Sequence, residues 1–229
     1  MTTSAAPAIA WEDFAPAPRD FLQCLCALPN VLPQPAFEAL AAEIEQFVAT
    51  ERNYVPAHKK GGTIAYETLR ESAPRVAGFY QSPQLHRFIS DIVGANVGPT
   101  PPHDQSSCSV LFYERPGDHI GWHYDHNFYQ GRHFTMLLSI VNRGFDNGLS
   151  AARLMVKHGR GEQVIATPPN TLVVFEGAKV RHKVTPLNDG ERRMVLSMTF
   201  CTDNRHSVIQ ECMRRVKDTA FFGPRALWS

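Results

Sequence analysis

The chain lacks the features of a membrane-embedded, secreted or nucleic-acid-binding protein. None of its apolar runs is long enough to span a bilayer. The N-terminal stretch contains no Lys or Arg ahead of an apolar run, so we expect no secretory leader. The 23 basic and 22 acidic residues leave a formal net charge of +1, and neither sign is gathered into a block. No nucleic acid and no membrane is therefore expected as a partner.

Paired cysteines are also missing. The chain has five cysteines, an odd number without a Cys-x-x-Cys motif, which favours reduced thiols over a disulfide framework. Because reduced thiols persist in the cytoplasm, we expect a cytoplasmic protein. No internal repeat is present, and 229 residues fit one domain with a sizeable core. Nothing in the sequence indicates the oligomeric state.

The predicted single domain, residues 1–229, has four parts. Residues 1–19 are rich in Ala and Pro, lack apolar periodicity and are expected to form a tail. Residues 20–105 are predicted to provide helical support. Residues 106–201 are predicted to form a β core, and residues 202–229 to contain a C-terminal helix.

Apolar residues at helical spacing predict the positions of the helices. The first begins near Pro35 and carries an apolar residue on one face at every third or fourth position. The second begins after Ser82, a natural N-cap, and ends at Gly94. The C-terminal helix begins at a capping box formed by Ser207 and Gln210.

The pattern of residues 106–201 is that of a β protein, because short runs rich in Val, Leu, Phe and Thr alternate with turn residues. We predict eight strands, at Ser107–Tyr113, His119–Tyr124, His133–Val141, Arg153–His158, Glu162–Ala166, Thr171–Phe175, Val180–Leu187 and Arg193–Cys201. The predicted fold is therefore mainly β with supporting α: a double-stranded β-helix, or jelly roll, flanked by N-terminal helices and a C-terminal helix. The earlier segment Lys59–Gly62 is expected to be a loop.

The stretch from Asp118 to Asp125 carries the clearest chemical signal. His123 and Asp125 are two residues apart, so both side chains leave the same face of an extended strand. The distant His182 can complete a set of two imidazoles and one carboxylate. Such a set leaves three positions open on an octahedral metal, as non-haem iron(II) oxygenases require. The same ligands could instead hold zinc in a cupin-like enzyme, or belong to a non-catalytic metal-binding barrel.

Several short motifs, taken in order, resemble the 2-oxoglutarate- and iron(II)-dependent dioxygenases of the prolyl-4-hydroxylase type. They are Tyr113–Gly117, His123–Asp125, Asn170–Phe175, His182–Pro186 and Gly190–Arg192. The resemblance covers residues 106–201 and implies iron(II), 2-oxoglutarate and O2 as cofactors, with release of succinate and CO2. One segment departs from the family, because Asn147–Ala151 stands where many relatives have Gly-Gly-Glu-Leu, and a carboxylate is missing there.

The resemblance also implies roles for individual residues. The metal ligands and catalytic residues would be His123, Asp125 and His182. The cosubstrate contacts would be Arg192, which would bind the distal carboxylate of 2-oxoglutarate, and Tyr113, Thr135 and Ser139. Because Asp125 fills the coordination position at which chloride could bind, we expect hydroxylation rather than halogenation.

Arg192 is preferred to Arg193 because of the alternation along the last predicted strand. Arg192 opens a face whose other members, from Met194 to Phe200, are apolar. Arg193 opens the more polar face, which includes Ser197. We expect the apolar face to fill the barrel, so that its first residue reaches the cosubstrate.

The segment 122–132 is predicted to meet the substrate at the mouth of the barrel. Its candidate contacts are Trp122, Tyr124, His126 and Arg132. No long basic or aromatic groove is present, so we expect a small-molecule substrate, with peptide or protein prolyl-type hydroxylation as the alternative. The remaining histidines without a partner at metal-ligand spacing are expected to be non-ligands: His58, His86, His103, His133, His158 and His206.

Overall fold

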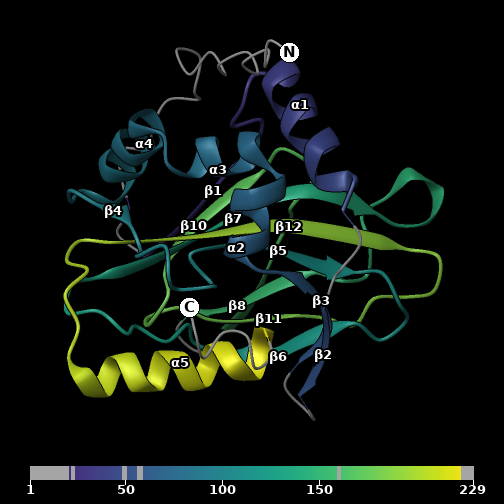
Figure 1. Ribbon diagram of the computed structural model, residues 1–229. Coiled ribbons are helices and arrows are strands. Elements are labelled where there is room, and N and C mark those ends of the chain that lie inside the picture. The colour runs from purple at the N-terminus through teal and green to yellow at the C-terminus, as the bar shows by residue number, and fades with distance from the viewer. Residues whose placement is uncertain (1–20, 22–23, 48–50, 56–58, 159–160, 223–229) are drawn as a thin grey trace.

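The computed structural model describes residues 21, 24–47, 51–55, 59–158 and 161–222. The predicted tail, residues 1–19, lies outside these residues. Within them, twelve antiparallel strands form one continuous sheet that nearly closes into a barrel (Figure 1). The strand order is β1-β10-β7-β12-β5-β3-β6-β11-β8-β9, with β2 paired to β3 and β4 paired to β12.

All eight strands predicted for the β core are present, with ends shifted by a few residues at most. They are β5 (Cys108–Tyr113), β6 (His119–His123), β7 (His133–Arg143), β8 (Leu154–His158), β9 (Gly161–Ile165), β10 (Leu172–Glu176), β11 (Arg181–Val184) and β12 (Arg192–Cys201). These strands and their antiparallel pairing confirm the predicted jelly-roll fold. Their positions could be predicted because the residue pattern of a strand is a local signal.

The N-terminal part adds strands that the sequence pattern did not reveal. They are β1 (Leu25–Leu28), β2 (Glu51–Val55), β3 (Lys59–Ile64) and β4 (Gly98–Pro99). The predicted loop at Lys59–Gly62 is wrong, because β3 fills the space between β5 and β6. A Cβ on Gly61 would lie 3.0 Å from the carbonyl oxygen of Phe112, so glycine here permits close strand pairing rather than a turn.

Four helices cover one face of the sheet (Figure 1). They are α1 (Gln34–Glu45), α2 (Tyr66–Ser72), α3 (Pro74–Tyr80) and α4 (Pro83–Val93). The predicted cap of α4 is confirmed, since Ser82 Oγ accepts the Leu85 N–H at 3.2 Å. Gly94 ends this helix in the left-handed conformation, with φ of 64°.

The sheet has apolar side chains on both faces, and they belong to two different cores. The outer face of β5, β7, β10 and β12 packs against the four helices, and β12 contributes Met194, Leu196, Met198 and Phe200 to this core. The inner face forms the barrel interior, to which β12 contributes Val195. The apolar face of β12 therefore lies outside the barrel, under the helices, and the more polar face lies inside.

Helix α5 (Val208–Phe222) lies on the opposite side of the barrel from α1–α4 (Figure 1). Its predicted capping box is confirmed by hydrogen bonds of 2.8 and 3.2 Å between Ser207 and Gln210. Its buried residues are charged: Arg214 Nη1 donates to Asp218 Oδ2 at 2.5 Å, whereas Val208 is 88% exposed. Polar contacts dock α5 against the loop before β5: Lys217 pairs with Asp104 at 3.2 Å, and Arg214 Nη1 donates to the carbonyl of His103 at 2.9 Å. No helix among the described residues is long and apolar enough to cross a membrane.

Candidate active site

The structure brings His123, Asp125 and His182 together at one end of the barrel. His123 ends β6 and is paired in register with His182 on β11. The Nε2 atoms of His123 and His182 lie 3.5 and 3.8 Å from Asp125 Oδ1. The three ligand atoms all lie within 4.8 Å of one another, so one ion can reach all three. We call these residues the triad.

Backbone and side-chain contacts hold the triad in this arrangement. The Nδ1 atoms of His123 and His182 lie 2.8 and 3.1 Å from backbone carbonyl oxygens, which turns each Nε2 towards Asp125. The Asp125 N–H donates to the carbonyl of Gly177 at 3.1 Å. A Cβ on Gly177 would lie 2.8 Å from Asp125 Cβ, so only glycine lets the two segments approach this closely.

The electrostatics of Asp125 and His182 favour the protonation states that bind a metal, whereas burial of His123 is outweighed by its contact with Asp125, which raises the pKa of His123. Burial would raise the pKa of Asp125, but His182, together with hydrogen bonds from His123 and Thr135, lowers it well below the usual range. Burial lowers the pKa of His182, an effect that Asp125 only partly offsets. The donor set is thus one carboxylate and two imidazoles, which suits iron(II).

Thr135 holds the carboxylate of Asp125 in place. Its hydroxyl donates to Asp125 Oδ2 at 2.5 Å. We predict that Thr135→Val, which keeps the shape and removes this hydrogen bond, lowers iron(II) affinity by roughly 10–100-fold, as loss of outer hydrogen bonds does in other metal sites. Iron titration monitored by 2-oxoglutarate turnover measures the effect. Thr171→Val is the matched control, because the buried Thr171 hydroxyl has no hydrogen-bond partner among the residues that the structure describes. Equal affinity in both variants would contradict the role of Thr135.

A cavity of about 500 Å³ adjoins the triad. Strand β3, the strands of the barrel interior and helix α5 all contribute to its wall. Its lining includes Lys59, Thr63, Asp104, Ser109, Leu111, Ile120, Tyr124, His126, Phe128, His133, Thr135, Ser197, Thr199, Met213, Val216 and Lys217. Most of the charged side chains in the cavity wall therefore come from outside residues 106–201, the predicted β core that contains the triad.

The predicted orientation of the two arginines at the start of β12 is wrong. Arg192 points outward and contacts Glu114 and Glu45, at 3.1 and 3.6 Å. Arg193 is 1% exposed, faces the barrel interior and lies with its Cζ 5.9 Å from the centre of the Tyr113 ring. The error came from assuming that the apolar face of β12 is the inner one.

The other residues predicted to contact substrate or cosubstrate divide into two groups. Tyr124, His126 and Thr135 line the cavity, whereas Tyr113 lies beside Arg193 and is not among the cavity-lining residues. Trp122, Arg132 and Ser139 are not among the cavity-lining residues.

Each of these three side chains is held elsewhere. The Trp122 ring lies beneath Lys183 and Lys157, whose Nζ atoms are 4.5 and 5.0 Å from its centre. Arg132 pairs with Glu176 at 2.8 Å. The Ser139 hydroxyl donates to the carbonyl of Thr167 at 2.9 Å.

Sequence reasoning missed several polar residues of the cavity. Lys59 is 5% exposed and donates to Thr63 Oγ1 at 2.8 Å. Lys217 pairs with Asp104 at 3.2 Å. His133 is 6% exposed, and its Nδ1 has no hydrogen-bond partner. Alternation in β7 from Thr135 could have placed His133 on the inner face, but no local pattern indicates Lys59 or Lys217.

Most of the histidines predicted to be non-ligands can be compared with the structure. His86 and His133 are not near another set of ligand atoms among the described residues. His58 and the side chain of His158 lie outside the described part of the chain. His103 and His206 lie close to Glu211, a grouping that the spacing in the sequence did not predict.

The segment that departs from the family pattern is contacted by a carboxylate from a later part of the chain. The Ala151 N–H donates to Glu191 Oε2 at 2.9 Å, and the Asn188 N–H donates to the same atom at 3.0 Å. Glu191 therefore holds Asn147–Ala151 against the turn before β12.

Two family models match the sequence. Residues 18–131 match Halogenase D, and residues 108–200 match the 2OG-Fe(II) oxygenase superfamily. The second match contains the whole triad. Residues 108–200, which hold the β core, belong to the 2OG-Fe(II) oxygenase superfamily. A protein of this superfamily is a non-haem oxidoreductase that uses iron(II), 2-oxoglutarate and O2, which argues against the zinc enzyme and the non-catalytic barrel.

Solved structures of related oxygenases share the fold. The α-ketoglutarate-dependent epimerase SnoN from nogalamycin biosynthesis aligns with a TM-score of 0.62 and 12% identity, over 80% of this chain and 79% of its own. A Pseudomonas putida prolyl-4-hydroxylase gives 0.55 and 21%, over 80% and 94%. The carbocyclase SnoK gives 0.60 and 13%, over 86% and 87%. No curated protein matches the oxygenase by sequence.

Proposed function

We propose that this oxygenase hydroxylates a C–H bond of a small molecule. The cavity of about 500 Å³ beside the triad carries the proposal. Small-molecule sites typically measure roughly 300–1,000 Å³, so this cavity suits a metabolite rather than a protein. Iron(II) bound by the triad supplies oxidative decarboxylation of 2-oxoglutarate and oxidation of the C–H bond. The chain's own residues hold and orient the two organic substrates.

Arg193 is our choice for the distal carboxylate of 2-oxoglutarate, in place of Arg192. Among the described residues its buried Nε has no hydrogen-bond partner and Arg193 makes no ion pair, while Nη1 donates to the carbonyl of Ala152. Burial lowers the pKa of this guanidinium, and Tyr113 only partly offsets the effect. A carboxylate would satisfy both the buried donor and the buried charge. The interior of the barrel therefore fits 2-oxoglutarate.

Hydroxylation is preferred to halogenation because of Asp125. The match to Halogenase D ends at residue 131 and so includes this position. A halide needs a coordination position on the metal, and the carboxylate of Asp125 occupies the position beside His123 and His182. The hydrogen bond from Thr135 keeps the carboxylate turned towards the two imidazoles.

Lys59 suggests that the substrate carries a carboxylate. Its ammonium group lies in the cavity wall, and burial lowers its pKa to about 8. From the cavity wall this ammonium group can form a charge-assisted hydrogen bond with an anionic group of the substrate. The neighbouring Lys60 offers a matched control, because its Nζ donates to the carbonyl of Pro116 at 2.7 Å and does not line the cavity.

The substrate class can be tested with a panel of free amino acids and other small carboxylic acids, each beside its methyl ester, together with short proline-containing peptides. Enzyme, iron(II), 2-oxoglutarate and chloride are present throughout. We expect a free acid to give the fastest succinate release and a product heavier by one oxygen atom. The ester should have a kcat/KM lower by roughly tenfold or more, from loss of a charge-assisted contact. Lys59→Met should remove this preference, whereas Lys60→Met should retain it.

Each part of the proposal can fail separately. A peptide turned over much more efficiently than every small molecule would make peptide hydroxylation the function. A chlorinated product would overturn hydroxylation. An acid preference that persists in Lys59→Met would overturn the role of Lys59.

A cytoplasmic location belongs to the same proposal. All five cysteines are free thiols in the structure. Free thiols and iron(II) both persist in a reducing compartment, which supports this location.

A further inference from the structure

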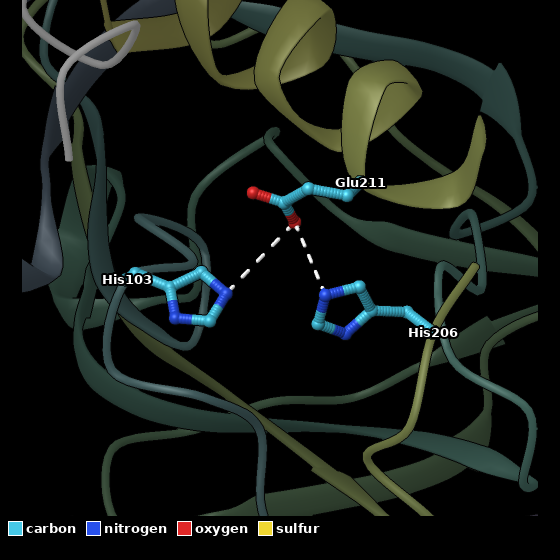
Figure 2. Close-up of side chains that lie close together, drawn as sticks. All are labelled: His103, His206 and Glu211. Atoms are coloured by element: carbon cyan, nitrogen blue, oxygen red, sulfur yellow. Dashed lines mark ion pairs between the residues drawn. The ribbon is translucent and has the colours of Figure 1, made fainter. Parts of the chain in front are cut away.

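A second group of two histidines and one carboxylate lies at the start of α5, outside the cavity lining. We call His103, His206 and Glu211 the α5 cluster. The Nε2 atoms of the two histidines lie 3.9 and 3.8 Å from Glu211 Oε2 (Figure 2). The corresponding distances in the triad are 3.5 and 3.8 Å. The imidazole–carboxylate distances of the α5 cluster are therefore close to those of the triad, and its three ligand atoms lie within 4.8 Å of one another.

The two imidazoles approach the carboxylate from different segments of the chain. His103 precedes β5, His206 lies between β12 and α5, and Figure 2 shows both rings directed at the same Glu211 oxygen. The Nδ1 of His206 faces the carbonyl of Asn204 at 3.4 Å, which leaves Nε2 as the ligand atom. The side chains are 39%, 30% and 21% exposed, so an ion can enter and water can complete its coordination.

Two arginines fix the position of the Glu211 carboxylate. Arg214 donates to both oxygens, at 2.9 and 2.8 Å, and Arg215 donates to Oε1 at 2.8 Å. Carboxylates that bind metals are usually hydrogen-bonded in this way. The positive charge that the arginines bring is reduced by Asp218, which pairs with Arg214 at 2.5 Å. The carboxylate thus stays oriented while Oε2 faces the two imidazoles.

We propose that the α5 cluster is a second metal site, and that it binds zinc. Imidazole nitrogen and carboxylate oxygen are both zinc ligands, and water can take the fourth tetrahedral position. Tetrahedral zinc at its usual bond lengths separates neighbouring ligand atoms by roughly 3.4 Å, so the present 3.8 and 3.9 Å require movements of a few tenths of an ångström. The site is independent of the substrate proposed above.

Zinc bound at this site would stabilise the position of one wall of the substrate cavity. Helix α5 contributes Met213, Val216 and Lys217 to that wall. His103 lies next to Asp104, another wall residue, which pairs with Lys217. An ion shared by His103, His206 and Glu211 would cross-link the three segments and stabilise the folded position of α5.

The experiment uses full-length, metal-free protein in which Asp125→Ala and His182→Ala together disable the triad. Zinc chloride is titrated against a competing chromophoric chelator, and the melting temperature is measured with and without zinc. We expect one zinc equivalent, and a melting temperature that rises with zinc. Adding His103→Ala or Glu211→Gln should lower zinc affinity by more than the roughly 10–100-fold seen when only an outer hydrogen bond to a ligand is lost. Adding His86→Ala, which removes a histidine outside both sites, should change neither measurement.

The outcomes separate this proposal from the proposed function, because no oxygenase activity is measured. If the triad-disabled protein binds no zinc, the α5 cluster is an ion-pair network only. If His103→Ala and Glu211→Gln both retain the zinc equivalent, the ion binds elsewhere. Either result overturns the proposed site and leaves the oxygenase assignment untouched.

Discussion

His182→Ala is expected to abolish iron(II)-dependent turnover of 2-oxoglutarate. His182 is 5% exposed, and its Nε2 completes the triad at 3.8 Å from Asp125 Oδ1. Loss of a hydrogen bond to a metal ligand already costs roughly 10–100-fold, so loss of a ligand should reduce turnover to below about one-hundredth of the wild-type value. Succinate release at saturating 2-oxoglutarate, measured over a range of iron(II) concentrations, tests this expectation.

His86→Ala serves as the control for this variant. His86 is a half-buried histidine on α4, and its Nε2 lies 2.9 Å from the carbonyl of Tyr80, away from the cavity. The His86→Ala variant should retain the wild-type dependence of turnover on iron(II). Melting temperatures of both variants distinguish loss of the metal site from loss of the fold. Normal iron binding and turnover in a folded His182→Ala protein would show that the triad is wrongly assigned.

The second large effect is expected for Arg193→Met. Removing a charge-assisted, two-point partner of a carboxylate in a buried site should cost on the order of 2–4 kcal/mol, or roughly 30- to 1,000-fold in the KM for 2-oxoglutarate. Arg193→Lys should recover part of the loss, because it restores the charge without the planar guanidinium. The KM for 2-oxoglutarate is measured at saturating iron(II).

Arg192→Met is the matched control, since it removes the adjacent guanidinium from the outer face. On the outer face Arg192 contacts two carboxylates that are themselves partly exposed. Its loss should therefore change the KM for 2-oxoglutarate little. A large rise in KM for Arg192→Met, with a near-normal value for Arg193→Met, would restore the assignment made from the sequence. A rise in KM for both variants would mean that the cosubstrate depends on both arginines, contrary to their positions on opposite faces of β12.

Strand positions and the chemistry of the triad could be predicted because both depend on local features. The strands of the β core are short runs rich in Val, Leu, Phe and Thr between turn residues, and His123 and Asp125 are two residues apart on one segment. His182 was harder to place, because it lies far from His123 in sequence, but the motifs around both residues indicated the same family. By contrast, β3 and Lys59 were missed, since a Lys-Lys-Gly-Gly stretch is typical of a turn and only β5 and β6 make it a strand.

The sequence by itself determined the eight strands of the core, the caps of α4 and α5, and the three residues that meet in the triad. The tertiary structure alone decided which face of β12 is the inner one. Both faces of β12 are buried: one packs under α1–α4, and the other lines the barrel interior with its polar groups. Hydrophobicity therefore cannot show which face is the inner one. The tertiary structure also decided that His103, His206 and Glu211 meet, because ion pairs dock α5 against a loop about a hundred residues earlier in the chain.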